Sequence, residues 1–148
     1  PIRFFATSAQ KRKLQGSFGL TVGNFWSGKA NVITTGLRYQ LPPKFTISLT
    51  SNQTFARLPQ GNFVARIFSS TVDYSASPLL TFRNLIQFDN RSGNLGLQSR
   101  VRWTLAPGND LFFIYGQGWV QELDERGGLD FRVQDTRLAT KLQYTFRF

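Results

Sequence analysis

Apolar and polar residues alternate along much of the chain. Between Leu95 and Leu105, one parity carries mostly leucine, valine and tryptophan, and the other carries glycine, glutamine, threonine and two arginines. Side chains of an extended chain point to opposite faces in turn, so this segment has one apolar and one polar face. The alternation recurs over residues 33–41, 80–88 and 137–148. The pattern predicts β-strands and no helix.

Other segments alternate less strictly. Residues 14–26 and 45–56 follow the pattern loosely, and residues 111–121 begin apolar on both parities. In residues 62–74 the apolar parity changes from Phe63 and Ile67 to Val72 and Tyr74, a change that a β-bulge would explain. The sequence thus predicts about eight long antiparallel strands, most of about 10 to 13 residues, with residues 1–13 as a poorly ordered lead-in.

The connections fall into two alternating sets. LPPK, SASP and APGND are compact and contain proline, which presets a turn and blocks strand pairing. Between them lie RLPQG, DNRSGN and QELDERGGLDF. Alternation of this kind is typical of strands that run up and down, because every second connection then lies at the same end of the sheet.

The composition removes the usual parts of most enzymes. The 148 residues include no histidine and no cysteine, so the commonest general base, the commonest metal ligand and a thiol nucleophile are all missing. The formal net charge is +10, but most basic residues occur singly on one parity of the strands, without a nucleic-acid-binding motif. We expect no catalytic residues, no cofactor, no metal and no nucleic-acid partner.

Basic residues on the polar parity favour a transmembrane barrel over a soluble one. They are Arg38, Arg83, Arg100, Arg102, Arg137 and Lys141. These side chains would be costly in a dry core, but a water-filled barrel interior can hydrate them. The strands also have the length that crosses a membrane, whereas soluble strands cluster near about five or six residues. The sequence predicts a single domain over residues 1–148, an antiparallel up-and-down transmembrane β-barrel. A soluble sandwich or lipocalin-like ligand-binding barrel, with the apolar parity inside, is the alternative.

Two further features leave alternatives open. A basic lumen would favour anions, but about eight strands enclose little space, and side chains could simply fill it. Asp124, Glu125 and Asp130 in DERGGLD suit a solvated outer loop; a membrane-embedded enzyme with an acidic site there is the alternative. Aromatic residues near strand ends, among them Phe25, Trp26 and Trp103, suggest interfacial girdles.

Several motifs are similar to a known family. The run VDYSASPLLTFRNLIQFDNRSGNLGLQSRVRWTLAPGNDLFFIYGQGW, followed by RLATKLQYTFRF, resembles the C-terminal region of a bacterial outer-membrane family. Its members carry an N-terminal carbohydrate-binding-module-family-9-like domain and a C-terminal β-barrel of unknown function. The resemblance covers residues 41–148 and is most specific in YSASP, QFDNRSGNLGLQSRVRW and APGNDLFFIYGQGW. It implies an outer-membrane location, with further strands or a periplasmic domain outside this sequence.

The last residues, KLQYTFRF, alternate aromatic and polar side chains. This ending resembles the signal by which the barrel-assembly machinery of the outer membrane recognises an unfolded barrel, adding the last strand to its own sheet edge. The resemblance implies that Tyr144, Phe146 and Phe148 form an assembly signal. Outer-membrane lipid and the assembly machinery are therefore the expected partners of a structural or passage protein without catalytic activity.

Overall fold

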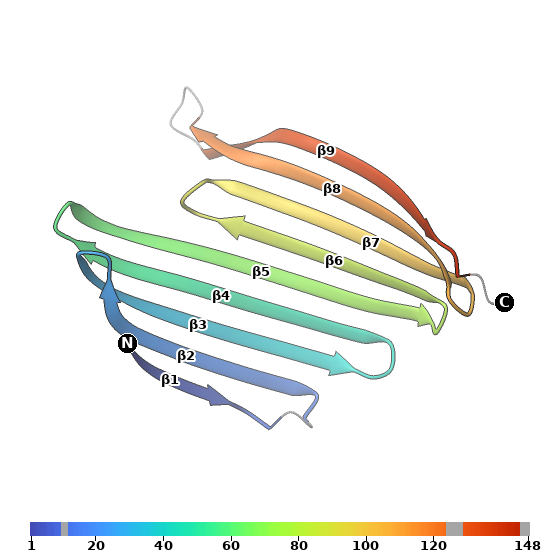
Figure 1. Cartoon of the computed structure of the whole chain (residues 1–148), viewed down its shortest axis with the longest axis horizontal. Helices are drawn as coiled ribbons and strands as arrows, with labels where there is room; N and C mark the ends of the chain where they lie inside the picture. The colour runs from blue at the N-terminus through green and yellow to red at the C-terminus, as the bar shows by residue number, and fades with distance from the viewer. Residues whose placement is uncertain (10–11, 124–128, 146–148) are drawn as a thin grey trace.

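The computed structural model contains one single-layer, all-β antiparallel sheet (Figure 1). It describes residues 1–9, 12–123 and 129–145. Nine strands occur in these residues: β1 (Ile2–Thr7), β2 (Leu14–Phe25), β3 (Gly28–Leu41), β4 (Phe45–Leu58), β5 (Gly61–Ser77), β6 (Leu80–Asp89), β7 (Asn94–Ala106), β8 (Asn109–Leu123) and β9 (Leu129–Gln143). No helix in the described part of the chain is long and apolar enough to cross a membrane.

Each strand pairs only with its neighbours in sequence, so the order across the sheet is β1 to β9. This confirms the predicted antiparallel up-and-down topology. The sheet is not closed, because β1 and β9 are its two edges and do not pair with each other. The predicted number of strands was one too low, since Ile2–Thr7 pairs with β2 instead of forming a lead-in. This strand is short and apolar on both parities, with Phe4 and Phe5 adjacent, so it shows no alternation.

The connections lie at two opposite ends of the sheet (Figure 1). The β3–β4, β5–β6 and β7–β8 turns, with Pro42, Pro78 and Pro107, lie at one end, here called the Pro42 end. The β2–β3 turn, with Trp26, lies at the other, here called the Trp26 end, together with the β4–β5 and β6–β7 turns. The predicted alternation of the two sets of connections is confirmed.

Cross-strand pairing assigns each residue to a face, because directly paired residues of antiparallel strands lie on the same side. Leu97 on β7 pairs with Ile86 on β6, and Arg100 pairs with Arg83. The leucine row and the arginine row thus lie on opposite faces. The apolar and polar parities predicted for residues 33–41, 80–88 and 95–105 match the pairing across β3, β6 and β7.

The predicted bulge in residues 62–74 is wrong. The β4–β5 ladder runs without interruption from Leu58, paired with Gly61, to Phe45, paired with Tyr74. Phe63 therefore lies on the polar face together with Ile67. A bulge that was not predicted occurs in β9, where Gly118 pairs with Asp135 but Trp119 pairs with Val133, so Gln134 is extra. Beyond it, the faces of β9 exchange parity.

The sheet has almost no core of its own. Among the described residues, Ala30 and Ala56 are the only buried apolar ones. Both belong to the polar face near the Trp26 end, on the side where the rings of Phe25 and Phe63 contact each other at 6.4 Å between centroids. Large apolar side chains on the other face, such as Leu138 at 78% exposure, are uncovered. That face requires a covering that the sheet does not provide.

Candidate functional site

All six predicted basic residues lie on the polar face. Arg38 on β3 and Arg137 on β9 belong to one cross-strand row, whose other members are Gln15, Ser48, Thr71, Leu85, Gln98 and Gly116. The next two rows toward the Pro42 end hold the other four basic residues. Arg83 and Arg100 lie in the first of these rows, and Arg102 and Lys141 lie in the second. The structure thus places five of the six basic residues on β6 to β9, four of them in these two rows, while Arg38 stands apart on β3.

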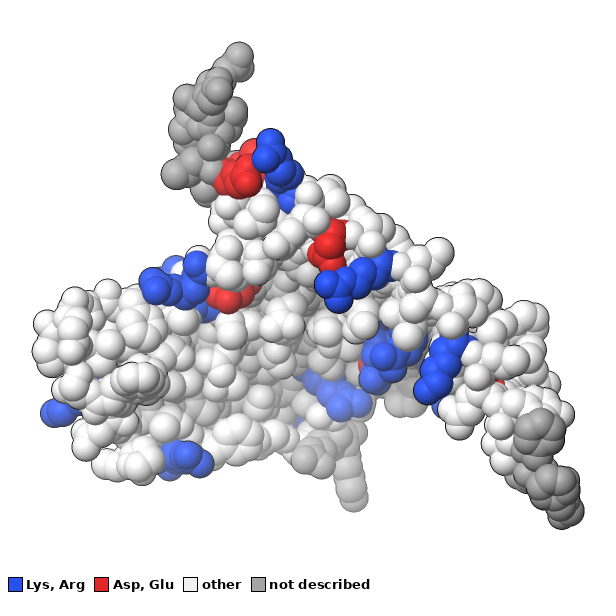
Figure 2. Space-filling view, turned by 45° about the horizontal axis from the view of Figure 1, so that its top comes forward, with Lys and Arg blue, Asp and Glu red and all other residues white. Residues whose placement is uncertain are grey.

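The polar face is the hollowed one. Figure 2 shows its middle lying deeper than its borders, with basic and acidic side chains over the strands near the C-terminus. The apolar face is accordingly the convex side of the sheet.

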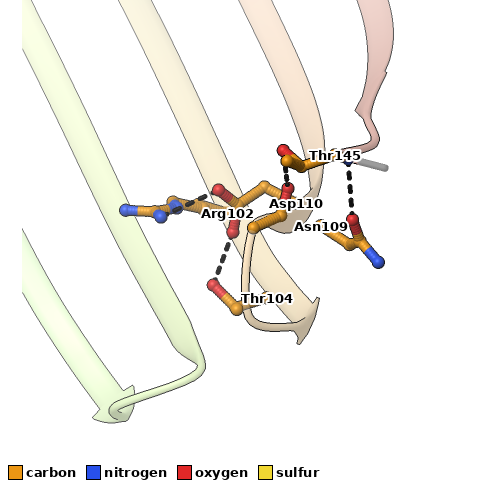
Figure 3. Close-up of polar contacts among 6 residues, drawn as sticks. Arg102, Thr104, Asn109, Asp110 and Thr145 are labelled. Carbon is orange, nitrogen blue, oxygen red and sulfur yellow. Dashed lines mark hydrogen bonds and ion pairs between the residues drawn. The ribbon is translucent and has the colours of Figure 1, made fainter. Parts of the chain in front are cut away.

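Two arginines of the cluster are held by aspartates on neighbouring strands. Nε of Arg83 lies 2.5 Å from Oδ1 of Asp73, across the β5–β6 ladder. Nη2 of Arg102 donates to Oδ2 of Asp110 at 2.8 Å, and the hydroxyl of Thr104 donates to the other carboxylate oxygen at 2.6 Å (Figure 3).

Asp110 lies next to the β7–β8 turn and is only 7% exposed. The hydrogen bond from Arg102, aided by the one from Thr104, lowers the pKa of its carboxyl group, while burial opposes this shift. The carboxylate therefore stays charged and keeps its arginine in place.

Arg83 and Arg100 line two hollows on the polar face. The larger has a volume of about 460 Å³ and is bordered by Asp73, Tyr74, Ser75, Thr81, Phe82, Arg83, Arg100, Arg102 and Phe112. The smaller, of about 240 Å³, is lined by Thr71, Arg83, Leu85, Gln98 and Arg100. Within the described ranges, Arg100 has no carboxylate partner, although Arg83 and Arg102 on either side of it are paired.

The segment after β9 is tied to the β7–β8 turn (Figure 3). The backbone N–H of Thr145 donates to Oδ1 of Asn109 at 2.9 Å, and its hydroxyl donates to the carbonyl of Gly108 at 2.8 Å. Tyr144 precedes this contact and is 58% exposed. Phe146 and Phe148 lie outside the described residues, so the assembly signal stays a prediction.

The acidic segment offers little geometry. Asp124 and Glu125 lie outside the described residues, and Asp130 at the start of β9 accepts a hydrogen bond from the backbone N–H of Phe131 at 2.8 Å. Nearby, Glu122 pairs with Arg132 at 3.4 Å. Across residues 1–9, 12–123 and 129–145, no cluster of three or more acidic side chains could hold a metal ion.

Two aromatic rows cross the apolar face, and the sequence analysis did not identify them. The row nearer the Trp26 end, here called row A, contains Phe18, Phe68, Phe88 and Trp119. The row nearer the Pro42 end, here called row B, contains Phe45, Tyr74, Phe82 and Phe113. The rows are separated by six residues along each strand, or about 20 Å. That spacing recurs in β5, β6 and β8 and was the available sequence signal.

Charged side chains are absent between the two rows on the apolar face of the described strands. The charged residues that share this face are Lys29, Arg57 and Arg66, and all of them lie between row A and the Trp26 end. Trp103 extends the aromatic surface beyond row B on the apolar face, whereas Phe25, which the sequence assigned to the same predicted girdles, lies on the polar face. The apolar face therefore carries an uncharged band bounded by aromatic side chains.

Four polar side chains in this band form two hydrogen bonds with one another. The hydroxyl of Ser99 donates to Oδ1 of Asn84 at 2.6 Å, and the hydroxyl of Tyr115 donates to the side-chain oxygen of Gln117. Paired in this way, these groups are less costly to remove from water than free ones.

Comparisons with known protein families, with curated proteins and with solved structures found no match for this chain. The fold and the geometry of the two faces are thus the basis for assigning a function.

Proposed function

We propose that this chain forms part of the wall of a bacterial outer-membrane β-barrel, with the apolar face toward lipid and the polar face toward a watery interior. The uncharged band from row A, across row B, to the level of Trp103 carries the proposal. Outer-membrane barrels have a lipid-facing apolar band about 25 Å tall, flanked by aromatic girdles. From row A to the level of Trp103 is eight residues along β7, or about 27 Å before strand tilt.

The curvature of the sheet supports a polar interior. Basic side chains lie on the concave face (Figure 2). Uncovered side chains such as Leu138 and Leu142 lie on the opposite, convex face. A soluble lipocalin-like barrel needs the reverse arrangement, because its apolar residues fill the inside. The direction of curvature therefore favours lipid as the covering of the apolar face.

The open edges of the sheet imply additional strands. Nine strands alternate in direction, so β1 and β9 run the same way, and pairing them directly would give a parallel contact. An odd number of further strands is required to close an entirely antiparallel barrel. Unpaired backbone groups at an edge cost several kcal/mol each in hydrocarbon. The expected partners are these strands, outer-membrane lipid and the barrel-assembly machinery.

The role we propose is structural or concerned with passage, without catalysis or a cofactor. The basic residues on the concave face would give a water-filled lumen a positive potential, which attracts anions. Reversal potentials of the reconstituted protein across a planar bilayer under a salt gradient test this part. Anion preference is expected, cation preference would contradict it, and an absence of conductance would indicate a purely structural wall.

The face assignment is tested with single cysteine labels. The natural sequence contains no cysteine, so Leu97→Cys and Arg100→Cys each introduce one unique site. With a fluorophore at each site in lipid vesicles, we expect a lipid-phase quencher to act on position 97 and an aqueous quencher on position 100. Folded protein should also migrate differently in SDS before and after boiling. Reversed quenching, or a monomer soluble without detergent, would refute the membrane proposal.

A further inference from the structure

We propose that the hollow beside Arg100 is a binding site for an oxyanion, a phosphate, sulfate or carboxylate group. This inference rests on the proposed function, because it assumes that the concave face borders a water-filled interior and names the class of ligand that would bind there. The site consists of Arg100 at the centre, with Arg83 and Arg102 on its flanks.

The first argument is an uncompensated charge. Arg83 and Arg100 are direct cross-strand partners on the same face, where like charges opposite each other destabilise a sheet. Asp73 pairs with Arg83 and Asp110 with Arg102, so Arg100 is the one of these three arginines that has no carboxylate partner among the described residues. A bound anion would supply the missing negative charge and remove the repulsion.

The second argument is preorganisation. Asp73 accepts from Nε and Nη2 of Arg83, at 2.5 and 3.3 Å, so that guanidinium is held while its Nη1 remains available. Asp110 accepts from Nη2 of Arg102 in the same way. The side chains of Arg83 and Arg102 remain 63% and 52% exposed, so a ligand from solution can reach them. Planar guanidinium groups match the oxygens of such anions with paired hydrogen bonds.

The third argument is the rest of the lining. Ser75 and Thr81 are cross-strand partners in the same row as Arg102, and both border the hollow, so their hydroxyls add neutral donors. Phe112, which pairs with Arg102, places an apolar surface at the border. At about 460 Å³, the space exceeds what one inorganic anion needs. A larger molecule with an anionic group beside an apolar or ring portion would also fit.

The test is calorimetric titration of the protein in uncharged detergent micelles with sodium sulfate, sodium phosphate and sodium acetate, at constant ionic strength. We expect saturable binding at one site, and the comparison with acetate distinguishes tetrahedral anions from carboxylates. Arg100→Gln should weaken binding about tenfold or more, because charge-assisted hydrogen bonds are lost. Arg100→Lys, which retains the charge without the planar fork, should have an intermediate effect.

Arg38→Gln is the matched control, because it removes the same charge from the same face but on β3. We expect this variant to change the affinity for the anion less than twofold, because Arg38 lines neither hollow. Equal weakening by the two glutamine variants would reveal a general basic field, and unsaturable binding would refute the site. Failure here leaves the quenching pattern of the labelled positions unchanged, so the two proposals fail separately.

Discussion

Replacing Leu97 with arginine would test the lipid-facing band most directly. Leu97 lies on the apolar face in β7. It is two residues from Leu95, which is a member of row A, and four residues from Val101, which is a member of row B. The level halfway between the rows is that of Gln98, so Leu97 lies about 3.4 Å from it along the strand. The substitution therefore places a charge close to the centre of the proposed bilayer core.

The expected cost follows from depth. An arginine on the lipid face of an outer-membrane barrel costs about 2 to 4 kcal/mol at the midplane and about 0 to 1 kcal/mol near the interfaces. Leu97→Arg should approach the first range. Asn31→Arg is the matched control, because Asn31 is on the same face but four residues, or about 13 Å, beyond the level of row A toward the Trp26 end. It should cost no more than the second range.

The measurement is urea unfolding of each variant in phosphatidylcholine vesicles, followed by the intrinsic fluorescence of the three tryptophans, Trp26, Trp103 and Trp119. Arg100→Gln, made in parallel, should change the free energy of unfolding by less than about 0.5 kcal/mol, since it alters a solvated side chain and relieves repulsion from Arg83. Equal costs for Leu97→Arg and Asn31→Arg would refute the reasoning. So would a cost below about 1 kcal/mol for Leu97→Arg.

Three other predictions concern the turn near Asp110 and the terminal aromatics. Gly108→Ala should destabilise the protein by about 1 to 2 kcal/mol in urea unfolding, because φ is +86° and the added carbon would lie 3.2 Å from the C-terminal segment; Gly16→Ala, with open space, should be milder. Asp110→Asn should make the free energy of unfolding depend less on pH at acid pH. The lowered pKa of this carboxyl group stabilises the fold above its unfolded pKa of 3.8, and this contribution disappears as the pH falls through the lower folded value. Replacing Phe146 and Phe148 by serine should reduce membrane insertion in cells far more than unfolding stability in detergent; equal effects would make the terminus ordinary packing.

The fold was predicted best from strands that have one polar and one apolar face. In β7 every second residue from Gly96 to Thr104 is small or polar, so alternation alone identifies both the strand and its faces. The pattern failed in β5, because Phe63 lies on the polar face, where its ring contacts that of Phe25 near the Trp26 end. Local alternation carries no information about such a contact, which depends on a strand three positions away in the sheet.

The candidate site was predicted in part. Alternation placed Arg83, Arg100 and Arg102 on a common face, but their clustering depends on the register between strands, which single-strand patterns do not contain. The aspartates were harder to assign. Asp73 follows a loosely patterned stretch, and Asp110 lies in a turn motif, so their pairing with arginines 10 and 8 residues away emerges only from hairpin geometry. The bulge at Gln134 also has no marker such as glycine or proline.

Pairing only between sequence neighbours has a consequence for how such a protein can change in size. No strand is inserted between two others that are distant in sequence, so when a hairpin of two strands and its turn is duplicated or lost, only the ladders at its two borders must form again. Such an event preserves the direction of every later strand, and with it the face on which each arginine lies. The wall can therefore be widened or narrowed in evolution by units of two strands, while its inner and outer surfaces keep their chemistry.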